Sequence, residues 1–488
     1  MKKLQDILFG SRVKKITGNP HLAIESLHDD SRSVKKSSLF VAIEGTQVDG
    51  HKYISSAIEK GAAAIVLEQG RLPNDIDDNV CYVEVENTSE SLGYIASNFY
   101  DNPSEKLKLV GITGTNGKTT VATLCFELFK SLGYPVGLVS TIQNKINNQV
   151  IDATHTTPNA IALNALLQQM VQAGCEFCFM EVSSHAVHQN RVAGVKFTGG
   201  VFTNISRDHL DYHKTFNEYI KAKKKFFDDL PSSAFALSNA DDANGEVMLQ
   251  NTVANKLYYA MKRPADFKVK VLENAFHGMR LELNNQDFHT PLVGSFNAYN
   301  LNAVFGIASL LGQDKEQVLM AMSLLKPVNG RFQHYTNERG AVVVVDYAHT
   351  PDALENVLKT IGQIRGGNEK LITVVGCGGN RDKGKRPEMA KVAVTYSDKT
   401  IFTSDNPRNE NPDNIIDDMK AGVSGEYFMK YTTQRDRMEA IKQALLEAQA
   451  SDIVLIAGKG HENYQEINGE RHHFDDLETA INLSKLIN

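Results

Sequence analysis

The sequence predicts an α/β protein of three domains: a small α/β domain at 1–103, a central parallel-sheet domain at 104–327 and a C-terminal Rossmann-like α/β domain at 328–488. Three observations support this prediction. The chain has 488 residues, enough for about three domains of roughly 150 residues each. Short apolar runs alternate with helix-like stretches, which is typical of parallel sheets. Turn residues at 101–104 and 326–330 separate the runs into three groups.

In the first domain, strands are expected at 39–43 and 63–67, with a helix over 53–60 that stops at Gly61. In the central domain, an apolar strand over 107–113 runs into GTNGKTT and then into a helix that ends before Gly133. Apolar residues recur along that helix at the spacing of one buried face. They are Val121, Leu124, Cys125, Leu128, Phe129 and Leu132.

The last third of the chain repeats this pattern four times. Strands are expected at 342–345, 371–375, 399–403 and 453–457, followed by DYAHTP, GCGGNRDKGKRP, SDNPR and GKGHE. Each polar cluster follows the carboxyl end of a strand, which is where ligands bind in open α/β sheets. The central and C-terminal domains are therefore expected to direct functional edges toward one another.

Composition excludes several classes of protein. The 52 Lys+Arg and 58 Asp+Glu residues leave a net charge of −6, which argues against a dedicated nucleic-acid binder. The start MKKLQDILFGSRVKK lacks the apolar run of a signal peptide, and no stretch approaches the ~18 apolar residues of a membrane span. Five scattered cysteines predict no disulfide framework, and we interpret Cys175 and Cys178 as buried thiols rather than zinc ligands. A cytoplasmic protein without nucleic-acid or membrane partners is expected.

The segment GITGTNGKTT at 111–120 is interpreted as a phosphate-binding loop. Its glycines allow backbone N–H groups to turn toward phosphate oxygens, Lys118 adds a positive charge, and a threonine hydroxyl is a ligand for Mg²⁺. Ile112 stands where the strict GxxxxGK[ST] pattern has its first glycine. A glycine-rich structural turn is the alternative, but the Lys–Thr pair opens an amphipathic helix, which favours phosphate binding.

Three further segments carry possible metal ligands. Glu181 follows an apolar strand, where a second metal-holding acid is usual in nucleotide sites, although a strand-end glutamate also occurs without a metal. The polar stretch TNISRDHLDYH at 203–213 is compatible with a zinc site, a Mg²⁺ site or a solvated loop. The basic run at 219–226 is compatible with a solvated helix face. It is also compatible with a lysine that takes up CO₂ as a carbamate.

Taken together and in order, these motifs resemble those of the Mur ligases, the ATP-dependent ligases of peptidoglycan precursor synthesis. The set is DDSR, LFVAIEG, GTNGKTT, MEVSSHA, TNISRDHLDYH, YIKAK, GSFNAYNLNA, GRFQ, DYAHTPDALE, GCGGNRDKGKRP, SDNPR and AGKGHE, and it spans the whole chain. One motif alone is weak evidence, whereas the ordered set is specific. The resemblance is greatest to the branch of the family that adds the third amino acid.

The resemblance implies that the first domain binds the uridine end of UDP-MurNAc-L-Ala-D-Glu. The central P-loop ATPase-like domain would bind ATP, and the C-terminal domain would bring the incoming amino acid. ATP would phosphorylate the substrate carboxylate, and the amine would displace phosphate from the acyl phosphate. Such chemistry needs charge neutralisation and in-line placement rather than a protein nucleophile. A monomeric cytoplasmic enzyme of cell-wall synthesis, serving cell shape and division, is implied.

The resemblance also assigns site residues. Nucleotide contacts would come from Gly114, Thr115, Asn116, Gly117, Lys118, Thr119, Thr120, Asn297, Asn300, Arg331 and Asp346. The UDP-MurNAc-dipeptide would contact Ser31, Thr156, Thr157, Ser183, Gln189 and Arg191. His155 stands where some relatives have asparagine, so its contact with substrate is left open.

Two Mg²⁺ ions are implied by the resemblance. Thr119 and Glu181 would hold one, and His209 with a carbamylated Lys223 (N6-carboxylysine) would serve the other. With Lys118, the residues Glu181, His209 and Lys223 form the expected catalytic set. Lys223 is chosen because the family places that lysine four residues after a tyrosine, here Tyr219.

On that choice, Lys221, Lys224 and Lys225 are expected to be ordinary surface charges. The incoming amino acid is expected to be meso-diaminopimelate, because the DNPR form resembles enzymes that add it. Arg408 would offer a bidentate fork to its distal carboxylate. The full expected set is Arg381, Asp405, Asn406, Pro407, Arg408, Gly458 and Glu462. The alternative for Arg408 is a simple pair with Asp405 at a loop surface.

Other functions are compatible with parts of the sequence. The same ligation with L-lysine is possible, and a folylpolyglutamate synthetase-type ligase shares the phosphate loop, although the DDSR, LFVAIEG, DNPR and GKGHE motifs argue against it. An ATP-binding regulator without catalysis would be expected to have lost Lys118, Glu181, His209 or Lys223, yet all four are present. A P-loop switch or motor would need no amino-acid pocket, so the motifs expected to form that pocket argue against this function.

Overall fold

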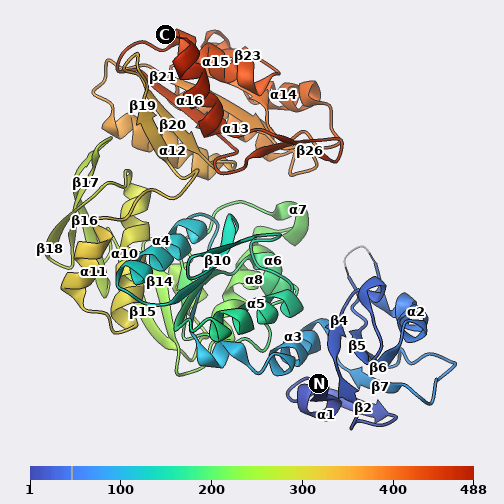
Figure 1. Ribbon diagram of the computed structural model, residues 1–488. Coiled ribbons are helices and arrows are strands. Elements are labelled where there is room, and N and C mark those ends of the chain that lie inside the picture. The colour runs from blue at the N-terminus through green and yellow to red at the C-terminus, as the bar shows by residue number, and fades with distance from the viewer. Residues whose placement is uncertain (46–47, 488) are drawn as a thin grey trace.

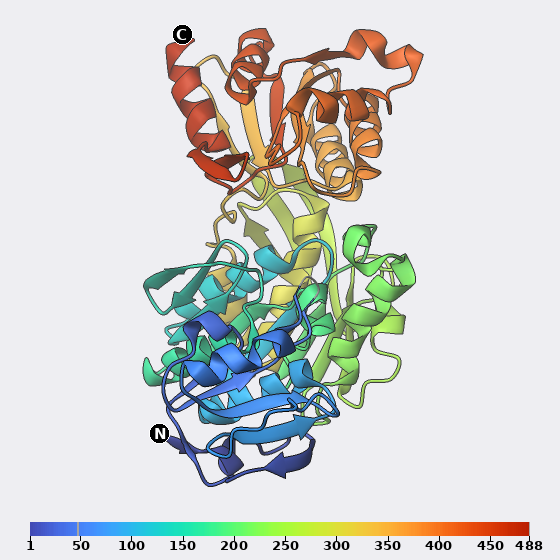
Figure 2. The same ribbon diagram turned by 90° about the vertical axis from the view of Figure 1, so that its right-hand side faces the viewer.

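The computed structural model describes residues 1–45 and 48–487, and it has three α/β units arranged in a row (Figure 1). In Figure 1 the C-terminal unit lies above the central unit and the N-terminal unit lies at its lower right, and in Figure 2 the N-terminal unit faces the viewer in front of the lower part of the central unit. Each unit contains one large sheet, and the order of strands within each sheet requires crossover connections. The three-domain α/β fold class is therefore confirmed, while the boundaries after residues 103 and 327 stay predictions.

The N-terminal unit is built on a five-stranded sheet in the order β2-β7-β6-β5-β4. Its strands are β2 (Val13–Thr17), β4 (Ser26–His28), β5 (Ser38–Val41), β6 (Ala62–Glu68) and β7 (Cys81–Val85). All neighbours are parallel except β2 and β7. Helices α1 (Leu4–Ile7) and α3 (Thr88–Phe99) pack on one face, and α2 (Ile54–Glu59) packs on the other. A small pair, β1 (Lys2–Lys3) with β3 (Ala23–Ile24), lies beside them.

The central unit has an eleven-stranded sheet in the order β11-β10-β9-β12-β8-β13-β14-β15-β16-β17-β18. Strands β9 (Val136–Val139), β12 (Phe177–Glu181), β8 (Lys108–Thr113), β13 (Gly199–Phe202), β14 (Phe235–Asn239), β15 (Asn255–Ala260) and β16 (Phe267–Ala275) run parallel. Both edges are extended by antiparallel strands. These are β10 (Gln143–Ile146) and β11 (Gln149–Asp152) at one edge, and β17 (Gly278–Leu283) and β18 (Gln286–Thr290) at the other.

Residue alternation along the central strands explains how helices cover both faces. In β12, Phe177 and Phe179 join the core beneath α4 (Lys118–Ser131), α10 (Ser295–Leu310) and α11 (Lys315–Met322). Cys178 and Met180 face the opposite core, beneath α5 (Ala160–Gln172), α6 (Ser184–His188) and α8 (Phe216–Asp228). Successive side chains of a strand point to opposite faces, so an uninterrupted apolar run is required where both faces are buried. Two short helices, α7 (Leu210–His213) and α9 (Gly245–Met248), complete this unit.

The C-terminal unit has six strands in the order β19-β20-β24-β21-β22-β23. They are β19 (Gln333–Thr336), β20 (Val342–Asp346), β24 (Ile453–Ala457), β21 (Leu371–Cys377), β22 (Lys399–Ser404) and β23 (Tyr431–Thr433), and only β19 is antiparallel. Helices α12 (Pro351–Ile364), α13 (Lys385–Tyr396) and α14 (Pro412–Lys420) cover one face. Helices α15 (Arg437–Glu447) and α16 (Asp476–Leu486) cover the other. A hairpin of β25 (Tyr464–Ile467) and β26 (Glu470–His473) follows β24.

Most predicted elements are confirmed within one or two residues, among them β8, β21, β22 and β24. The helix expected over 53–60 begins as a 3-10 turn at Gly50–Tyr53 and continues as α2 to Glu59. All five cysteines are free and buried, as expected. Within residues 1–45 and 48–487, no helix combines the length and apolar character that a membrane span requires.

Candidate functional site

A cavity of about 330 Å³ lies between the central and C-terminal units. Its walls come from the segments after β8, β13 and β14 of the central sheet and from the segment after β20 of the C-terminal sheet. The carboxyl ends of strands from both sheets therefore line one space, as the positions of the polar clusters predict. Asn116, Gly117, Thr120, Asn300, Arg331 and Asp346 are among its lining residues.

The phosphate loop has the backbone conformation that its glycines permit. Gly114 and Gly117 have φ angles of +152° and +87°, and a Cβ at Gly114 would lie 1.9 Å from Thr203 Oγ1. Gly117 is also the N-cap of α4 and provides no side-chain hydrogen bond to the first turn. Since the first N–H groups of a helix have no partner within it, those of α4 remain available to an anion.

Two residues that the sequence analysis did not select hold this loop. Thr203 Oγ1 donates to the carbonyl of Asn116 (2.6 Å), and Asn204 Oδ1 accepts from the N–H of the same residue (2.9 Å). The carbonyl of Asn204 accepts from the N–H of Thr115 (2.8 Å). Both residues belong to the TNIS segment at the end of β13, which lies next to β8 in the sheet. The position of these two residues after a strand indicates that they lie at the ligand-binding edge of the sheet. Their contact with the phosphate loop cannot be predicted in this way, because it depends on the order of the strands.

Lys118 and Lys223 converge on one carbonyl oxygen. Lys118 Nζ donates to the carbonyl of Gly114 (2.9 Å) and to that of Thr115 (2.8 Å), and Lys223 Nζ donates to Gly114 (2.7 Å). Lys223 is 1% exposed, and its Nζ lies 4.7 Å from the ring centre of Tyr219. Burial holds the pKa of Lys223 well below its ordinary value, and the charge of Lys118 lowers it further. The charged form of Lys223 is therefore less favoured here than in water.

The neighbouring lysines of α8 differ from Lys223. Lys221 pairs with Glu218 and Lys225 with Asp229 at the exposed surface, as expected. Lys224 does not fit that expectation fully, because its side chain is only 12% exposed where it pairs with Asp228 one turn along the helix.

Glu181 ends β12 with a fully buried side chain. Its Oε2 accepts from Thr119 Oγ1 (3.0 Å), and its Oε1 accepts from the backbone N–H of Thr141 (2.8 Å). A buried carboxylate against the threonine that follows Lys118 is the arrangement expected for a Mg²⁺ bound beside ATP phosphates. Thr141 was not selected from the sequence, because only the fold places it beside β12.

His209 lies in the left-handed backbone region, at φ 54°, before the short helix α7. Its Nε2 is 3.4 Å from Asp208 Oδ2, and its ring packs edge-on against His185 and Tyr219. The pKa of His209 is lowered, chiefly by burial, and the neighbouring His185 and Lys118 contribute to this. A neutral imidazole beside Lys223 results.

The protein residues fit the implied metal ions only together with other ligands. In residues 1–45 and 48–487, no three His, Cys, Asp or Glu side chains gather as a ready metal site. Mg²⁺ bound through one or two carboxylates completes its coordination with phosphate oxygens and water. Thr119 and Glu181 match that pattern, and a carbamate on Lys223 would add the acidic group that the His209 side lacks.

Residues from the second half of the chain close the cavity. Arg331 Nη2 donates to Thr119 Oγ1 (3.3 Å), its guanidinium lies over the ring of Tyr347 (4.5 Å), and its buried Nε has no partner. Asn300 donates to Asn297 Oδ1 (3.1 Å). Both oxygens of Asp346 accept from backbone N–H groups, and burial raises its pKa to about 6. A cation with an unused donor thus faces the phosphate loop.

Most of the expected UDP-MurNAc-dipeptide residues form one cluster. Arg191 donates to Gln189 Oε1 (2.6 and 2.9 Å) and to the carbonyl of Thr157 (2.8 Å). Thr157 Oγ1 donates to the carbonyl of Glu181 (2.8 Å) and contacts Ser183 Oγ (3.5 Å). Thr156 joins this group through Thr141, whose Oγ1 donates to it (3.1 Å).

Ser31 comes from another unit, and His155 has a contact of its own. Ser31 lies in the 3-10 turn Ser31–Ser33 of the N-terminal unit, where its carbonyl accepts from Lys60. The exposed His155 contacts Thr154 (3.2 Å).

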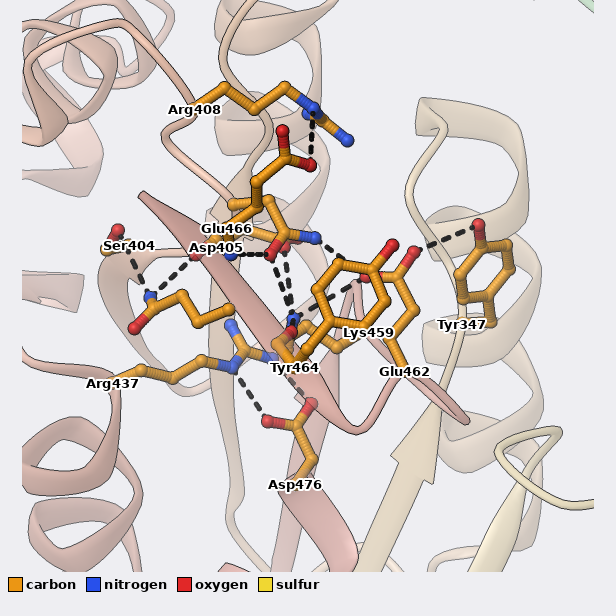
Figure 3. A network of polar contacts seen from close by, with 12 residues as sticks. Tyr347, Ser404, Asp405, Arg408, Arg437, Lys459, Glu462, Tyr464, Glu466 and Asp476 are labelled. Carbon is orange, nitrogen blue, oxygen red and sulfur yellow. Dashed lines mark hydrogen bonds and ion pairs between the residues drawn. The ribbon is translucent and has the colours of Figure 1, made fainter. Parts of the chain in front are cut away.

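The expected amino-acid residues follow strands β21, β22 and β24 of the C-terminal sheet, and Figure 3 shows Asp405, Arg408 and Glu462 of this set. Asp405, Asn406 and Pro407 are buried after β22, and Asn406 Nδ2 donates to Glu462 Oε2 (2.8 Å). Gly458 has φ +117°, and a Cβ there would lie 2.8 Å from Asp405 Oδ2.

The two arginines of this set have different surroundings. Arg381 is exposed. Arg408 Nε faces Glu466 Oε2 at 3.4 Å, and its Nη1 donates to the carbonyl of Gly379 (2.9 Å). Arg408 thus pairs with Glu466 of β25 rather than with Asp405.

This fold and this site define a class of protein, and comparison with known proteins agrees. The chain belongs to the Mur ligase family, whose members are ATP-dependent amide-forming ligases. Three family models match: "Mur ligase family, catalytic domain" at residues 23–100, "Mur ligase middle domain" at 112–308 and "Mur ligase, glutamate ligase domain" at 330–460.

Similar proteins carry a specific name. A UDP-N-acetylmuramoyl-L-alanyl-D-glutamate–2,6-diaminopimelate ligase of Phocaeicola vulgatus is 54% identical over 98% of both chains. One of the same name from Bacteroides fragilis is 53% identical over 99% of both chains. A solved structure of a ligase of this name is 34% identical, with a TM-score of 0.67 over 96% of both chains.

Proposed function

We propose that this protein joins meso-diaminopimelate to UDP-MurNAc-L-Ala-D-Glu in an ATP-dependent reaction that proceeds through an acyl phosphate. The observation that carries the proposal is the cavity between the units, which is lined by Asn116 and Gly117 of the phosphate loop and by Arg331. Arg331 also donates to Thr119, the hydroxyl of which donates to Glu181. Relatives named for this reaction, at 53–54% identity over nearly the whole chain, support it. In this proposal the enzyme acts as a cytoplasmic monomer.

The proposal divides the substrates among the three units. The N-terminal unit holds the uridine end, the cluster around Thr157 and Arg191 holds the muramoyl-dipeptide, and the C-terminal unit holds the amino acid. Lys118 and the uncapped N-terminus of α4 gather the phosphate charge of ATP. Arg331 brings a further cation from the C-terminal unit to the transferred phosphoryl group.

Mg²⁺, when bound, would neutralise charge on the phosphates and on the developing transition state. Thr119 and Glu181 are the residues proposed to hold one ion, and His209 with carbamylated Lys223 the other. Lys223 is suited to carbamylation because it is buried and its pKa is lowered, so that its amine is free to react with CO₂. A carbamate would also remove the repulsion between two ammonium groups on the carbonyl of Gly114.

A phosphate-release assay tests the proposed function. Wild type is given ATP, Mg²⁺ and UDP-MurNAc-L-Ala-D-Glu with meso-diaminopimelate, L-lysine or ornithine, and each component is omitted in turn. Release is expected only with the complete set and chiefly with meso-diaminopimelate. Lys118→Ala should lose ~10²-fold or more, the scale for a group that stabilises transition-state charge. Near wild-type ligation by that variant would contradict the assignment.

A further inference from the structure

Lys459 is a fully buried cation beneath the expected amino-acid site (Figure 3). It follows β24 within the GKGHE segment and is not one of the expected site residues. Lysine is almost never fully buried unless it is paired. Its surroundings therefore need an explanation.

The three N–H groups of the Lys459 ammonium match three acceptors. They are Asn406 Oδ1 (3.3 Å), Glu462 Oε2 (3.5 Å) and the carbonyl of Tyr464, and Asp405 Oδ1 lies 3.9 Å away. An ammonium group has three donors and no acceptor. Lys459 thus has no donor left for a substrate, but it contacts residues on two of the strand-end loops expected to bind one.

The charges around Lys459 leave one net negative charge. Asp405 and Glu462 contribute two carboxylates, and Lys459 offsets one of them. Beneath them, Arg437 and Asp476 form a bidentate, fully buried pair (2.7 Å for both bonds) that is neutral as a unit. One remaining negative charge suits the single ammonium group at one end of a diamino acid.

We infer that Lys459 is a positioning residue that holds Asp405, Asn406 and Glu462 as one preformed acceptor for an ammonium group of the incoming amino acid. This inference rests on the proposed function and adds the residue that sets the charge of its amino-acid pocket. Without the cation, the buried carboxylate of Asp405 and the half-buried carboxylate of Glu462 would repel one another. The favoured response is for Glu462 to take up a proton or to turn away, and either change removes an acceptor.

Protonation of Glu462 provides a signature that a purely structural role would lack. Burial raises the pKa of Glu462 and the charge of Asp405 raises it further, whereas Lys459 and the hydrogen bond from Asn406 lower it. The other titratable groups that face Glu462 are Tyr347, Tyr464 and Arg437. Loss of the Lys459 charge should therefore move the acid limb of kcat/KM for the amino acid to higher pH.

Lys459→Gln and Lys459→Met test the inference in the full-length enzyme. Glutamine keeps an N–H₂ donor for Tyr464 and Asn406 but removes the charge, and methionine removes both. The KM for meso-diaminopimelate should rise by about tenfold or more in Lys459→Gln, the scale of a lost charge-assisted contact. The KM for ATP should stay near that of wild type. Lys399→Met is the control, because Lys399 pairs with Glu447 at the opposite end of β22.

The outcomes separate this inference from the proposed function. Absence of ligation by wild type would overturn the proposed function and the inference with it. Normal wild-type ligation, with an unchanged KM for meso-diaminopimelate and an unchanged acid limb in Lys459→Gln, would overturn the inference alone. Failure of both Lys459 variants to fold, while Lys399→Met folds, would make Lys459 a structural residue and would equally overturn the inference.

Discussion

At the scale of single residues, the carbonyl oxygen of Gly114 is the most informative atom. It accepts from both Lys118 and Lys223 in a site with little solvent. Two ammonium groups on one oxygen repel each other, and burial disfavours each charge separately. The arrangement is relieved when Lys223 is neutral, when it becomes an anion by carbamylation, or when phosphate arrives.

Replacing Lys223 tests the carbamate directly. Lys223→Ala should be nearly inactive, because the acidic group proposed beside His209 is lost, and added short carboxylic acids should restore part of the activity. Ligation rates with and without such acids measure this. Lys221→Ala is the matched control, since Lys221 pairs only with Glu218 at the surface. If Lys221→Ala lost activity and Lys223→Ala kept it, the assignment of the carbamate to Lys223 would be wrong.

Arg408 tests the choice of amino acid. Meso-diaminopimelate has a second carboxylate that lysine lacks, and Arg408 is half-buried next to Glu466. Arg408→Ala should lose ~2–4 kcal/mol of preference for meso-diaminopimelate, the range for removing one partner of a desolvated charge pair. The ratio of kcat/KM for the two amino acids, in wild type and variant, gives this number. Equal use of lysine by wild type would refute the interpretation of DNPR as a motif that selects meso-diaminopimelate.

The sequence predicts some of these residues better than others. Lys118, Glu181 and Asp405 follow apolar strands, so their place at a sheet edge can be anticipated. Thr203 and Asn204 also follow a strand, but their contact with the phosphate loop depends on β13 lying next to β8. Lys459 gives no signal of its own, because a lysine between two glycines suggests an exposed turn.

At the scale of elements, the phosphate loop depends on the absence of side chains. Gly114→Ala would place a methyl group 1.9 Å from Thr203 Oγ1 on a backbone with positive φ. Such overpacking typically costs ~1–3 kcal/mol, and here it would also displace the N–H groups that face the nucleotide. We expect lower stability in urea unfolding and a marked loss of affinity for an ATP analogue.

Gly362 in α12 provides the matched control for that change. A Cβ there meets no atom within 4 Å, so Gly362→Ala should stabilise the helix by about 0.5–1 kcal/mol. Its affinity for the ATP analogue should stay unchanged. Equal loss of affinity in both alanine variants would mean that the loop is not the cause.

Element prediction from sequence succeeded where both faces are buried. Strand β24 is an uninterrupted apolar run and β21 is interrupted only by the buried Thr373, and the sequence predicts the bounds of each strand to within about two residues. The antiparallel strands at the edges of the central sheet are not predicted from the sequence. Strands β17 and β18 alternate polar with apolar residues and turn at Asn284 and Asn285, both with positive φ. That is a hairpin signal, but its attachment to the parallel sheet depends on tertiary structure.

At the scale of the whole molecule, the central and C-terminal units are joined by apolar packing of Val293 and Phe296 on the C-terminal core and by polar contacts. Asn116 Nδ2 donates to Asp352 (3.0 Å), Arg331 reaches Thr119, and Arg207 pairs with Glu388 (2.7 Å) at the surface. A nucleotide in the cavity between the units would add contacts to both. Its binding should therefore stabilise the two units jointly.

An ATP analogue at 100 times its Kd should stabilise the folded state by about 2.7 kcal/mol. Arg331→Ala should reduce this effect at the same analogue concentration, because the variant lacks the cation that crosses between the units. Arg207→Ala should leave the effect unchanged, since exposed ion pairs contribute only ~0–1 kcal/mol. Thermal unfolding with and without the analogue measures both. An undiminished effect in Arg331→Ala would contradict the bridging role.

Glu181 connects two substrate regions through one residue. Its carboxylate accepts from Thr119 on the nucleotide side, and its carbonyl accepts from Thr157 on the dipeptide side. Occupancy of one region should then alter affinity at the other, and linkage requires the factor to be identical in both directions. Calorimetric titration of an ATP analogue with and without UDP-MurNAc-L-Ala-D-Glu, and the reverse titration, would measure that factor. In Glu181→Gln the factor should approach one, so the two ligands would bind independently.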